Sequence, residues 1–162
     1  MAPLRILIAE DHVLMRAGLR LLLEQMNEVV VVAEASDGAE ALRLFALHRP
    51  DIAVLDIAME PLNGLEVTVR VKTEWPEVRV LMLSMYATDS YIEQALRAGA
   101  NGYLLKDAAP VELARAIRAV ASGGTYLSSA VASRVMKQFT QGTAEPQDGL
   151  EQLTRASGAS CG

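Results

Sequence analysis

The chain has 162 residues, 51% of them hydrophobic and 22% charged, values that suit one globular domain with some extra structure. Its net charge of −5 gives no basic field for nucleic acid, and no apolar run is long enough to span a membrane. The single cysteine, Cys161, excludes an internal disulfide, and no signal-peptide pattern opens the chain, so we expect a cytoplasmic protein.

Short runs rich in leucine and β-branched residues alternate with helical patterns through the first 122 residues. The runs lie at Leu4–Ala9, Val29–Ala33, Ile52–Leu55, Val78–Leu83 and Gly102–Leu105. Five strands alternating with five helices predict a parallel sheet that is covered on both faces. Because crossovers are right-handed, the expected fold is a doubly wound, flavodoxin-like α/β domain with strand order 2-1-3-4-5.

Capping signals predict where the helices begin and end. Asp37 with Glu40, and Asn63 with Glu66, have the capping-box spacing and begin the second and third helices. Other signals are a Leu19, Leu22, Leu23 and Met26 stripe in the first helix, Pro76 after the third, Thr88 and Gly99 around the fourth, and Pro110 in the first turn of the fifth.

The periodic pattern changes after Gly124. We predict the α/β domain over residues 1–123 and a linker over 124–140, with a helix from about Ser128 to Phe139. Residues 141–162 are mostly small and polar without an apolar stripe, and we expect them to be disordered.

Polar side chains follow four of the five predicted strands. The first run ends in Glu10 and Asp11, the third in Asp56, the fourth in Ser84 and the fifth in Lys106. The carboxyl ends of parallel strands share one edge, and ligands bind there at the crevice between strands one and three. The sequence therefore predicts that these side chains meet at one site.

Three crowded carboxylates are costly unless a cation neutralises them, and hard oxygen ligands suit Mg²⁺. Such a site fits phosphoryl transfer, in which the Asp56 carboxylate attacks phosphorus and forms an aspartyl phosphate. Lys106 would supply positive charge, and Ser84 a hydroxyl donor to a phosphoryl oxygen. Each residue alone fits a helix start, a turn or the solvated surface, but their joint placement favours a phosphoryl site.

Several other sites are disfavoured by the sequence. His12 and His48 have no cysteine or histidine companions, so neither indicates zinc. No glycine-rich phosphate loop follows the first strand, and Ile57 and Ala58 after Asp56 do not fit a D-x-D phosphatase loop.

The spaced motifs over roughly residues 4–136 resemble those of bacterial response-regulator receiver domains of the NarL/FixJ type. They are “ILIAEDHVLMRAGLRLLLE”, “VVAEASDGAEAL”, “RPDIAVLDIAM”, “NGLEV”, “VLMLSMY”, “ALRAGANGYLLKDA” and “ELARAIRAVASGGTYLS”. The resemblance implies that Asp56 is the phosphoacceptor. It also implies that Asp11, Asp56 and the backbone carbonyl of Ala58 bind Mg²⁺, with Glu10 acting largely through metal-bound water.

The same resemblance implies roles around the phosphoryl group. Ser84 would be the switch hydroxyl, Lys106 the phosphate-pairing lysine and Tyr103 an aromatic side chain that packs inward. Ala58 and Tyr86 flank the pocket and are candidates for setting the rate of hydrolysis. The chain would be no enzyme beyond self-catalysed phosphotransfer and dephosphorylation.

The implied partners are a sensor histidine kinase and a second copy of the chain. Phosphorylation would remodel the face of the fourth helix, fifth strand and fifth helix and promote a homodimer; the first and fifth helices are a further plausible dimer face. In relatives this change controls a DNA-binding domain. Here “GLEQLT” is followed by “RASGASCG” with no helix-turn-helix, so we expect this chain itself to bind no DNA and no membrane.

The turn after the phosphoacceptor departs from the family pattern. Many relatives have M-P-G there, whereas this chain has Met59, Glu60 and Pro61, which adds an acid near the site. Glu60 motivates the alternative of a pseudo-receiver, an interaction module that works without phosphorylation. A flavin-binding flavodoxin-like protein is a third possibility that rests on fold alone.

Overall fold

The computed structural model describes residues 2–144, including the side chains of residues 2–140. The chain divides into two compact units, residues 1–131 and 132–162. The predicted tail from residue 145 onward lies outside the described residues. The first unit contains the sheet and every predicted site residue.

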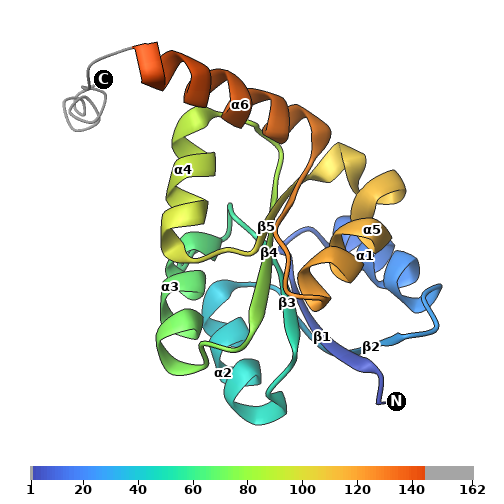
Figure 1. Ribbon diagram of the computed structural model, residues 1–162. Coiled ribbons are helices and arrows are strands. Elements are labelled where there is room, and N and C mark those ends of the chain that lie inside the picture. The colour runs from blue at the N-terminus through green and yellow to red at the C-terminus, as the bar shows by residue number, and fades with distance from the viewer. Residues whose placement is uncertain (1, 145–162) are drawn as a thin grey trace. The chain divides into compact units, whose positions relative to one another are not determined.

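Six parallel strands form the sheet in the described part of the chain, in the order β2-β1-β3-β4-β5-β6 (Figure 1). They are β1 (Leu4–Ala9), β2 (Val29–Ala35), β3 (Ile52–Asp56), β4 (Arg79–Ser84), β5 (Gly102–Leu105) and β6 (Tyr126–Leu127). The predicted order of the first five strands is confirmed. The prediction of five strands was wrong by one, because the two residues of β6 are too few to show a period-two pattern.

Helices cover both faces of the sheet (Figure 1). One face carries α1 (Val13–Glu24) and α5 (Ala109–Ala121), and the other carries α2 (Gly38–His48), α3 (Gly64–Glu74) and α4 (Asp89–Ala98). A short 3₁₀ turn, η1 (Lys106–Ala108), joins β5 to α5. The fold is therefore the doubly wound α/β domain that the strand and helix patterns predicted.

The inner strands are buried on both sides, which explains their nearly continuous apolar sequence. All of β3 is buried, and four of the six residues of β1 are completely buried. The face toward α1 and α5 is filled by Ile6, Ile8, Val54, Leu81, Leu83, Leu19, Leu23, Leu113, Ile117 and Val120. Burial of each large side chain contributes roughly 1.5–3 kcal/mol, so this layer holds the strand ends in fixed positions.

The predicted capping residues lie where the helices begin. Asn63 and Glu66 form a complete capping box at α3, and Thr88 caps α4. At α2, Asp37 accepts the Glu40 N–H at 2.8 Å, but the Glu40 side chain bonds the amide of Ser36. The reciprocal bond therefore lies one residue earlier than in a standard capping box.

The linker segment differs from its predicted boundaries. Tyr126 and Leu127 continue the sheet, and α6 runs over Ser129–Ala144, beginning later and ending later than the predicted helix. The polar residues after Phe139 continue the helix without an apolar stripe, which is the signal that the prediction required.

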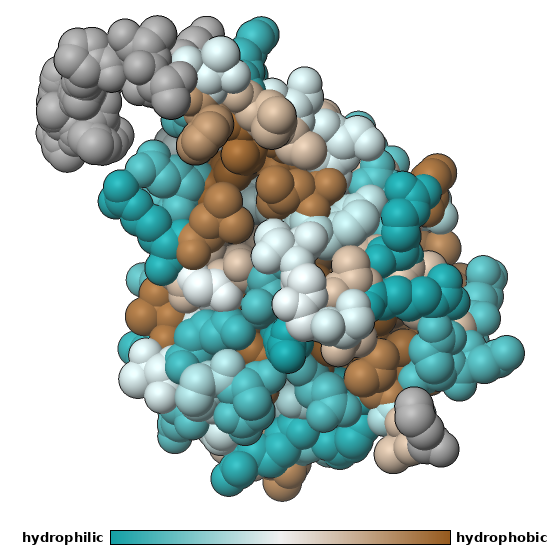
Figure 2. All heavy atoms as spheres, in the orientation of Figure 1, coloured by the Kyte–Doolittle hydropathy of each residue, from teal (hydrophilic) through white to brown (hydrophobic). Residues whose placement is uncertain are grey.

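The surface is largely hydrophilic in the view of Figure 2, and hydrophobic residues reach it in separate patches. One patch lies at the right of this view, where α1 and α5 are (Figures 1 and 2). Exposed hydrophobic residues of these two helices include Leu14 and Leu21 of α1 and Val111 of α5, all more than 60% exposed. Within residues 2–144, no helix has the length and apolar character required to cross a membrane.

Candidate functional site

The carboxyl-terminal edge of the sheet brings together the side chains that the sequence placed there. Glu10 follows β1 directly, Asp56 ends β3, and Lys106 follows β5. Glu10 and Asp56 are 0% and 1% exposed, and the Lys106 side chain is 12% exposed. Buried charges are costly unless they are paired, so the position of Lys106 decides whether the two buried carboxylates are compensated.

Lys106 is paired with both buried carboxylates. Its Nζ lies 3.1 Å from Glu10 Oε1 and 3.1 Å from Asp56 Oδ2. On the other side of Asp56, the Ala58 N–H donates to Oδ1 at 3.1 Å. The sheet thus holds one cation and one backbone donor against the predicted phosphoacceptor.

Burial and charge shift the protonation equilibria of this cluster. Burial, with a smaller contribution from the nearby Glu10 carboxylate, raises the pKa of Asp56 to about 6, although the Ala58 N–H and Lys106 act to lower it. Burial alone lowers the pKa of Lys106, but attraction to Asp56 and Glu10 outweighs it, and the net direction is upward. Lys106 therefore stays charged, and its positive charge only partly offsets the cost of burying the ionised Asp56 carboxylate.

The loop after Asp56 turns sharply because α3 begins almost at once. Gly64, the first residue of α3, donates to the Ile57 carbonyl at 3.1 Å. A Cβ atom at Gly64 would lie 2.4 Å from the backbone oxygen of Asp56. A glycine here allows the start of α3 to pack directly on the phosphoacceptor backbone.

Asp11 and His12 complete the acidic edge. The ring nitrogen Nδ1 of His12 lies 3.1 Å from Glu10 Oε2 and 3.2 Å from Asp11 Oδ1. One donor atom from each of Glu10, Asp11, His12 and Asp56 falls within 4.8 Å of the others. The sequence prediction found the three acids but missed His12, although its position next to Glu10 and Asp11 was a usable signal.

The donor set fits a divalent cation. Among the described residues, Glu10 Oε1 and Asp56 Oδ2 are buried side-chain oxygens that accept no hydrogen bond, although both lie near Lys106. Buried carboxylate oxygens with unfilled lone pairs are hard ligands of the kind that Mg²⁺ takes. Asp11, Asp56 and Glu10 are thus suited to the metal that the sequence predicted.

Ser84 and Tyr103 are linked through one backbone carbonyl. Ser84 Oγ and the Tyr103 hydroxyl both donate to the carbonyl of Tyr86, at 3.0 and 2.9 Å. The Tyr86 N–H donates back to Ser84 Oγ at 3.0 Å. Tyr103 is completely buried, and burial raises its pKa, so its ring already packs inward in this structure.

The remaining predicted residues lie on the rim. Ala58 and the Tyr86 side chain are exposed, consistent with positions that flank the pocket. Glu60 is also exposed, and the bond between Glu60 and Pro61 is cis. Lys106 pairs with Glu10 and Asp56 and not with this additional acid.

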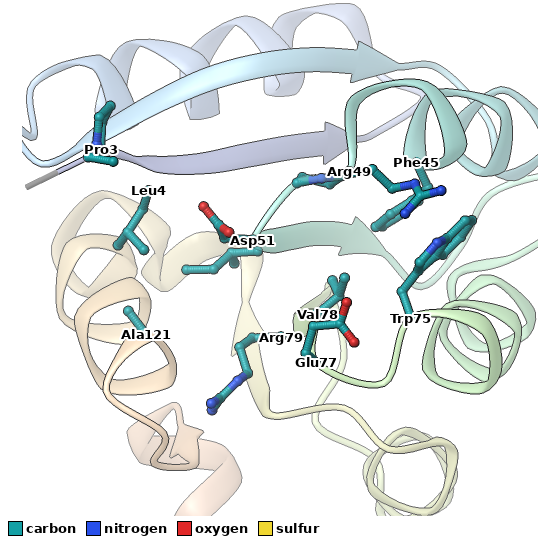
Figure 3. A pocket seen from close by; sticks show the side chains of 13 residues that line it. Pro3, Leu4, Phe45, Arg49, Asp51, Trp75, Glu77, Val78, Arg79 and Ala121 are labelled. Atoms are coloured by element: carbon teal, nitrogen blue, oxygen red, sulfur yellow. The ribbon is translucent and has the colours of Figure 1, made fainter.

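A separate cavity of about 380 Å³ lies at the opposite, amino-terminal edge of the strands (Figure 3). Phe45 stacks on Trp75 with ring centroids 5.9 Å apart, and the Arg49 guanidinium lies 5.7 Å from the Trp75 ring. None of the predicted site residues lines it. Trp75 therefore lies at the edge of the sheet opposite to Asp56.

Comparison with known proteins identifies the same kind of domain. Residues 6–118 match the family described as the response regulator receiver domain. The oxygen regulatory protein NreC of Staphylococcus aureus is 34% identical, over 94% of this chain and 72% of that protein. NreC of Staphylococcus haemolyticus is 36% identical, over 84% of this chain and 63% of its own length.

Solved structures agree with the fold. A two-component response regulator of the LuxR family from Aurantimonas sp. is 33% identical with a TM-score of 0.82, over 86% of this chain and 99% of that one. The signal receiver domain of the putative response regulator NarL from Mycobacterium tuberculosis is 37% identical with a TM-score of 0.73, over 76% of this chain and 99% of its own. With the buried Asp56 and Lys106 at the sheet edge and the family match over residues 6–118, the chain belongs to the response regulator receiver domain family.

Proposed function

We propose that this receiver domain accepts a phosphoryl group on Asp56 from a sensor histidine kinase in the cytoplasm, with Mg²⁺ bound by Asp11, Asp56, the Ala58 carbonyl and, through water, Glu10. The observation that carries the proposal is the 3.1 Å pairing of Lys106 Nζ with a buried Asp56 oxygen that accepts no hydrogen bond from the described residues. That oxygen is close to a positive charge and is not held by another donor.

In the proposed transfer, an Asp56 oxygen forms a bond to phosphorus while the bond from phosphorus to the donor histidine nitrogen breaks. The histidine ring keeps the electron pair of the broken bond. When bound, Mg²⁺ would neutralise charge on the phosphoryl oxygens. Lys106 exchanges part of its interaction with the carboxylates for a phosphoryl oxygen, and the protein adds no general base.

The switch involves the hydroxyl of Ser84. A phosphoryl oxygen on Asp56 offers Ser84 a charged acceptor in place of the Tyr86 carbonyl, and charge-assisted hydrogen bonds are stronger than neutral ones. The Tyr86 segment would then move with Ser84 while Tyr103 remains buried. This change would remodel the surface of α4, β5 and α5, promote a homodimer and control a DNA-binding output in a longer protein.

Phosphorylation can be tested with a small-molecule donor. The chain is incubated with acetyl phosphate and Mg²⁺, and its intact mass is measured. We expect one phosphate adduct that is absent in Asp56→Asn and in a sample with excess chelator. An adduct that survives Asp56→Asn would contradict the assignment, and the absence of any adduct would favour the pseudo-receiver, the module that works without phosphorylation.

A further inference from the structure

His12 lies against the acidic cluster and does not cap the helix that it precedes. It occupies the N-cap position of α1, yet its side chain makes no capping hydrogen bond. An N-cap is usually filled by a side chain that accepts a backbone N–H, as serine, threonine, aspartate and asparagine do. The ring of His12 is instead directed at Glu10 and Asp11, with its Nδ1 within 3.2 Å of an oxygen of each.

We propose that His12 Nδ1 is a direct ligand of the cation, which makes this site favour transition-metal ions such as Mn²⁺ and Co²⁺ over Mg²⁺. The inference rests on the proposed function in one respect, since both require a cation beside Asp56. It adds a nitrogen donor to a site that the three acids alone would make all-oxygen.

The spacing of the donors suits a shared octahedral ion. Two ligands on adjacent corners of an octahedron with bonds of about 2.1 Å lie about 3 Å apart. The Nδ1 of His12 is 3.1 Å from Glu10 Oε2 and 3.2 Å from Asp11 Oδ1. The ring therefore needs little movement to occupy a corner next to Asp11 Oδ1, which belongs to a direct ligand of the proposed site.

The surroundings of the ring favour an added cation. Glu10 Oε1 and Asp56 Oδ2 are buried and accept no hydrogen bond from the described residues. The Glu10 carboxylate is held from one side by the His12 backbone N–H at 3.1 Å and from the other by Lys106. The His12 side chain is 71% exposed, so an ion with its water can reach it from solvent.

The nitrogen donor determines which ions bind more tightly to the site. Imidazole is a good ligand for transition-metal dications, whereas Mg²⁺ takes oxygen ligands and retains its waters. Loss of the ring should therefore weaken binding of Mn²⁺ or Co²⁺ much more than binding of Mg²⁺. A ring that forms only hydrogen bonds or an ion pair with the acids predicts no such difference.

The test uses the untagged chain with Mn²⁺ and Co²⁺ at pH 8. Pulsed electron paramagnetic resonance on bound Mn²⁺ detects the nitrogen of a coordinated imidazole, and calorimetry gives Kd values for Co²⁺ and Mg²⁺. The variants are His12→Gln and, as the matched control, His48→Gln at the end of α2, away from the acidic edge. Circular dichroism and thermal unfolding verify the fold of each, and His12→Asn serves as a second variant.

We expect an imidazole nitrogen signal in the wild type and in His48→Gln but not in His12→Gln. The Kd for Co²⁺ should rise at least about tenfold in His12→Gln, while that for Mg²⁺ changes less than about threefold. Bound Mn²⁺ without this signal, or a signal that persists in His12→Gln, would overturn the inference and leave phosphorylation of Asp56 with Mg²⁺ intact. If the wild type binds none of the three ions, the inference and the metal part of the proposed function both fail.

Discussion

The ammonium of Lys106 lies 3.1 Å from Asp56 Oδ2, and it interacts equally closely with Glu10 Oε1. One buried cation thus serves two buried carboxylates that come from different strands. Removing one member of a buried ion pair leaves an uncompensated charge, and the cost greatly exceeds that of a surface pair.

Lys106→Met should therefore destabilise the fold at pH 8 by about 3 kcal/mol, since Met keeps the apolar stem but leaves Glu10 and Asp56 uncompensated. The deficit should shrink toward pH 5, where Asp56 can take up a proton. Urea unfolding at both pH values measures it. Lys137→Met, at an exposed position on α6, is the control and should change stability by less than about 0.5 kcal/mol. Equal stability of both variants would show that the Lys106 pairing contributes nothing.

Asp56→Asn should stabilise the chain when divalent cations are removed. The pKa of Asp56 is about 6 when folded and 3.8 as the reference value, so folding takes up protons across this window. The free energy of unfolding of the wild type then falls as pH rises from about 4 to 6. Above pH 6 the carboxylate is ionised, and the full cost of burying its charge is present. At pH 8 the variant should be more stable by up to about 3 kcal/mol, and less so as pH falls toward 4.

Denaturant unfolding in the presence of a chelator measures this difference. Adding Mg²⁺ should stabilise the wild type more than Asp56→Asn, because the cation neutralises the carboxylate that the variant lacks. A variant that is less stable than the wild type throughout pH 6–8 would contradict the expectation.

Gly64→Ala should shift the position of Asp56, because the added methyl group would collide with the backbone of Asp56 and Ile57. The new methyl would lie 2.4 Å from the Asp56 carbonyl oxygen and 2.9 Å from the Ile57 Cα, so strand β3 or helix α3 must shift. Overpacking of this kind costs about 1–3 kcal/mol, and we expect slower phosphorylation by acetyl phosphate as well. Gly18→Ala in α1 is the matched control, since nothing lies within 4 Å of its added Cβ. Gly18→Ala should stabilise the domain by up to about 1 kcal/mol, because alanine favours a helix more than glycine does. A Gly64→Ala variant that is equally stabilised would refute the steric argument.

Tyr103→Phe should loosen the segment after β4. The variant loses the 2.9 Å hydrogen bond to the Tyr86 carbonyl but keeps the buried ring, so we expect a cost of about 1 kcal/mol. Hydrogen exchange at the Tyr86 amide, which donates to Ser84 Oγ, should become faster. Tyr126→Phe removes a different hydroxyl bond, to Glu112, and should leave exchange at Tyr86 unchanged. Equal exchange in both variants would mean that Tyr103 does not hold this segment.

Local signals in the sequence were enough to predict most of the architecture. Leu4–Ala9 and Gly102–Leu105 were predicted with their observed ends, because a strand buried on both faces shows an unbroken apolar run between polar residues. Asn63 and Gly99 were predicted as helix ends because capping is a contact between residues close in sequence. Strand β6 escaped prediction because Tyr126 and Leu127 are strand residues only through their pairing with β5.

The sequence by itself also determined which residues gather at one edge, since Glu10 and Lys106 directly follow parallel strands and Asp56 is the last residue of one. Only the tertiary structure decided how they interact. The sharing of Lys106 between two acids, the approach of His12 to Glu10 and Asp11, and the joint use of the Tyr86 carbonyl by Ser84 and Tyr103 depend on side-chain directions and burial. Strand order places a residue to within a few ångströms, whereas hydrogen bonds and metal coordination depend on tenths of an ångström that packing of the whole domain sets.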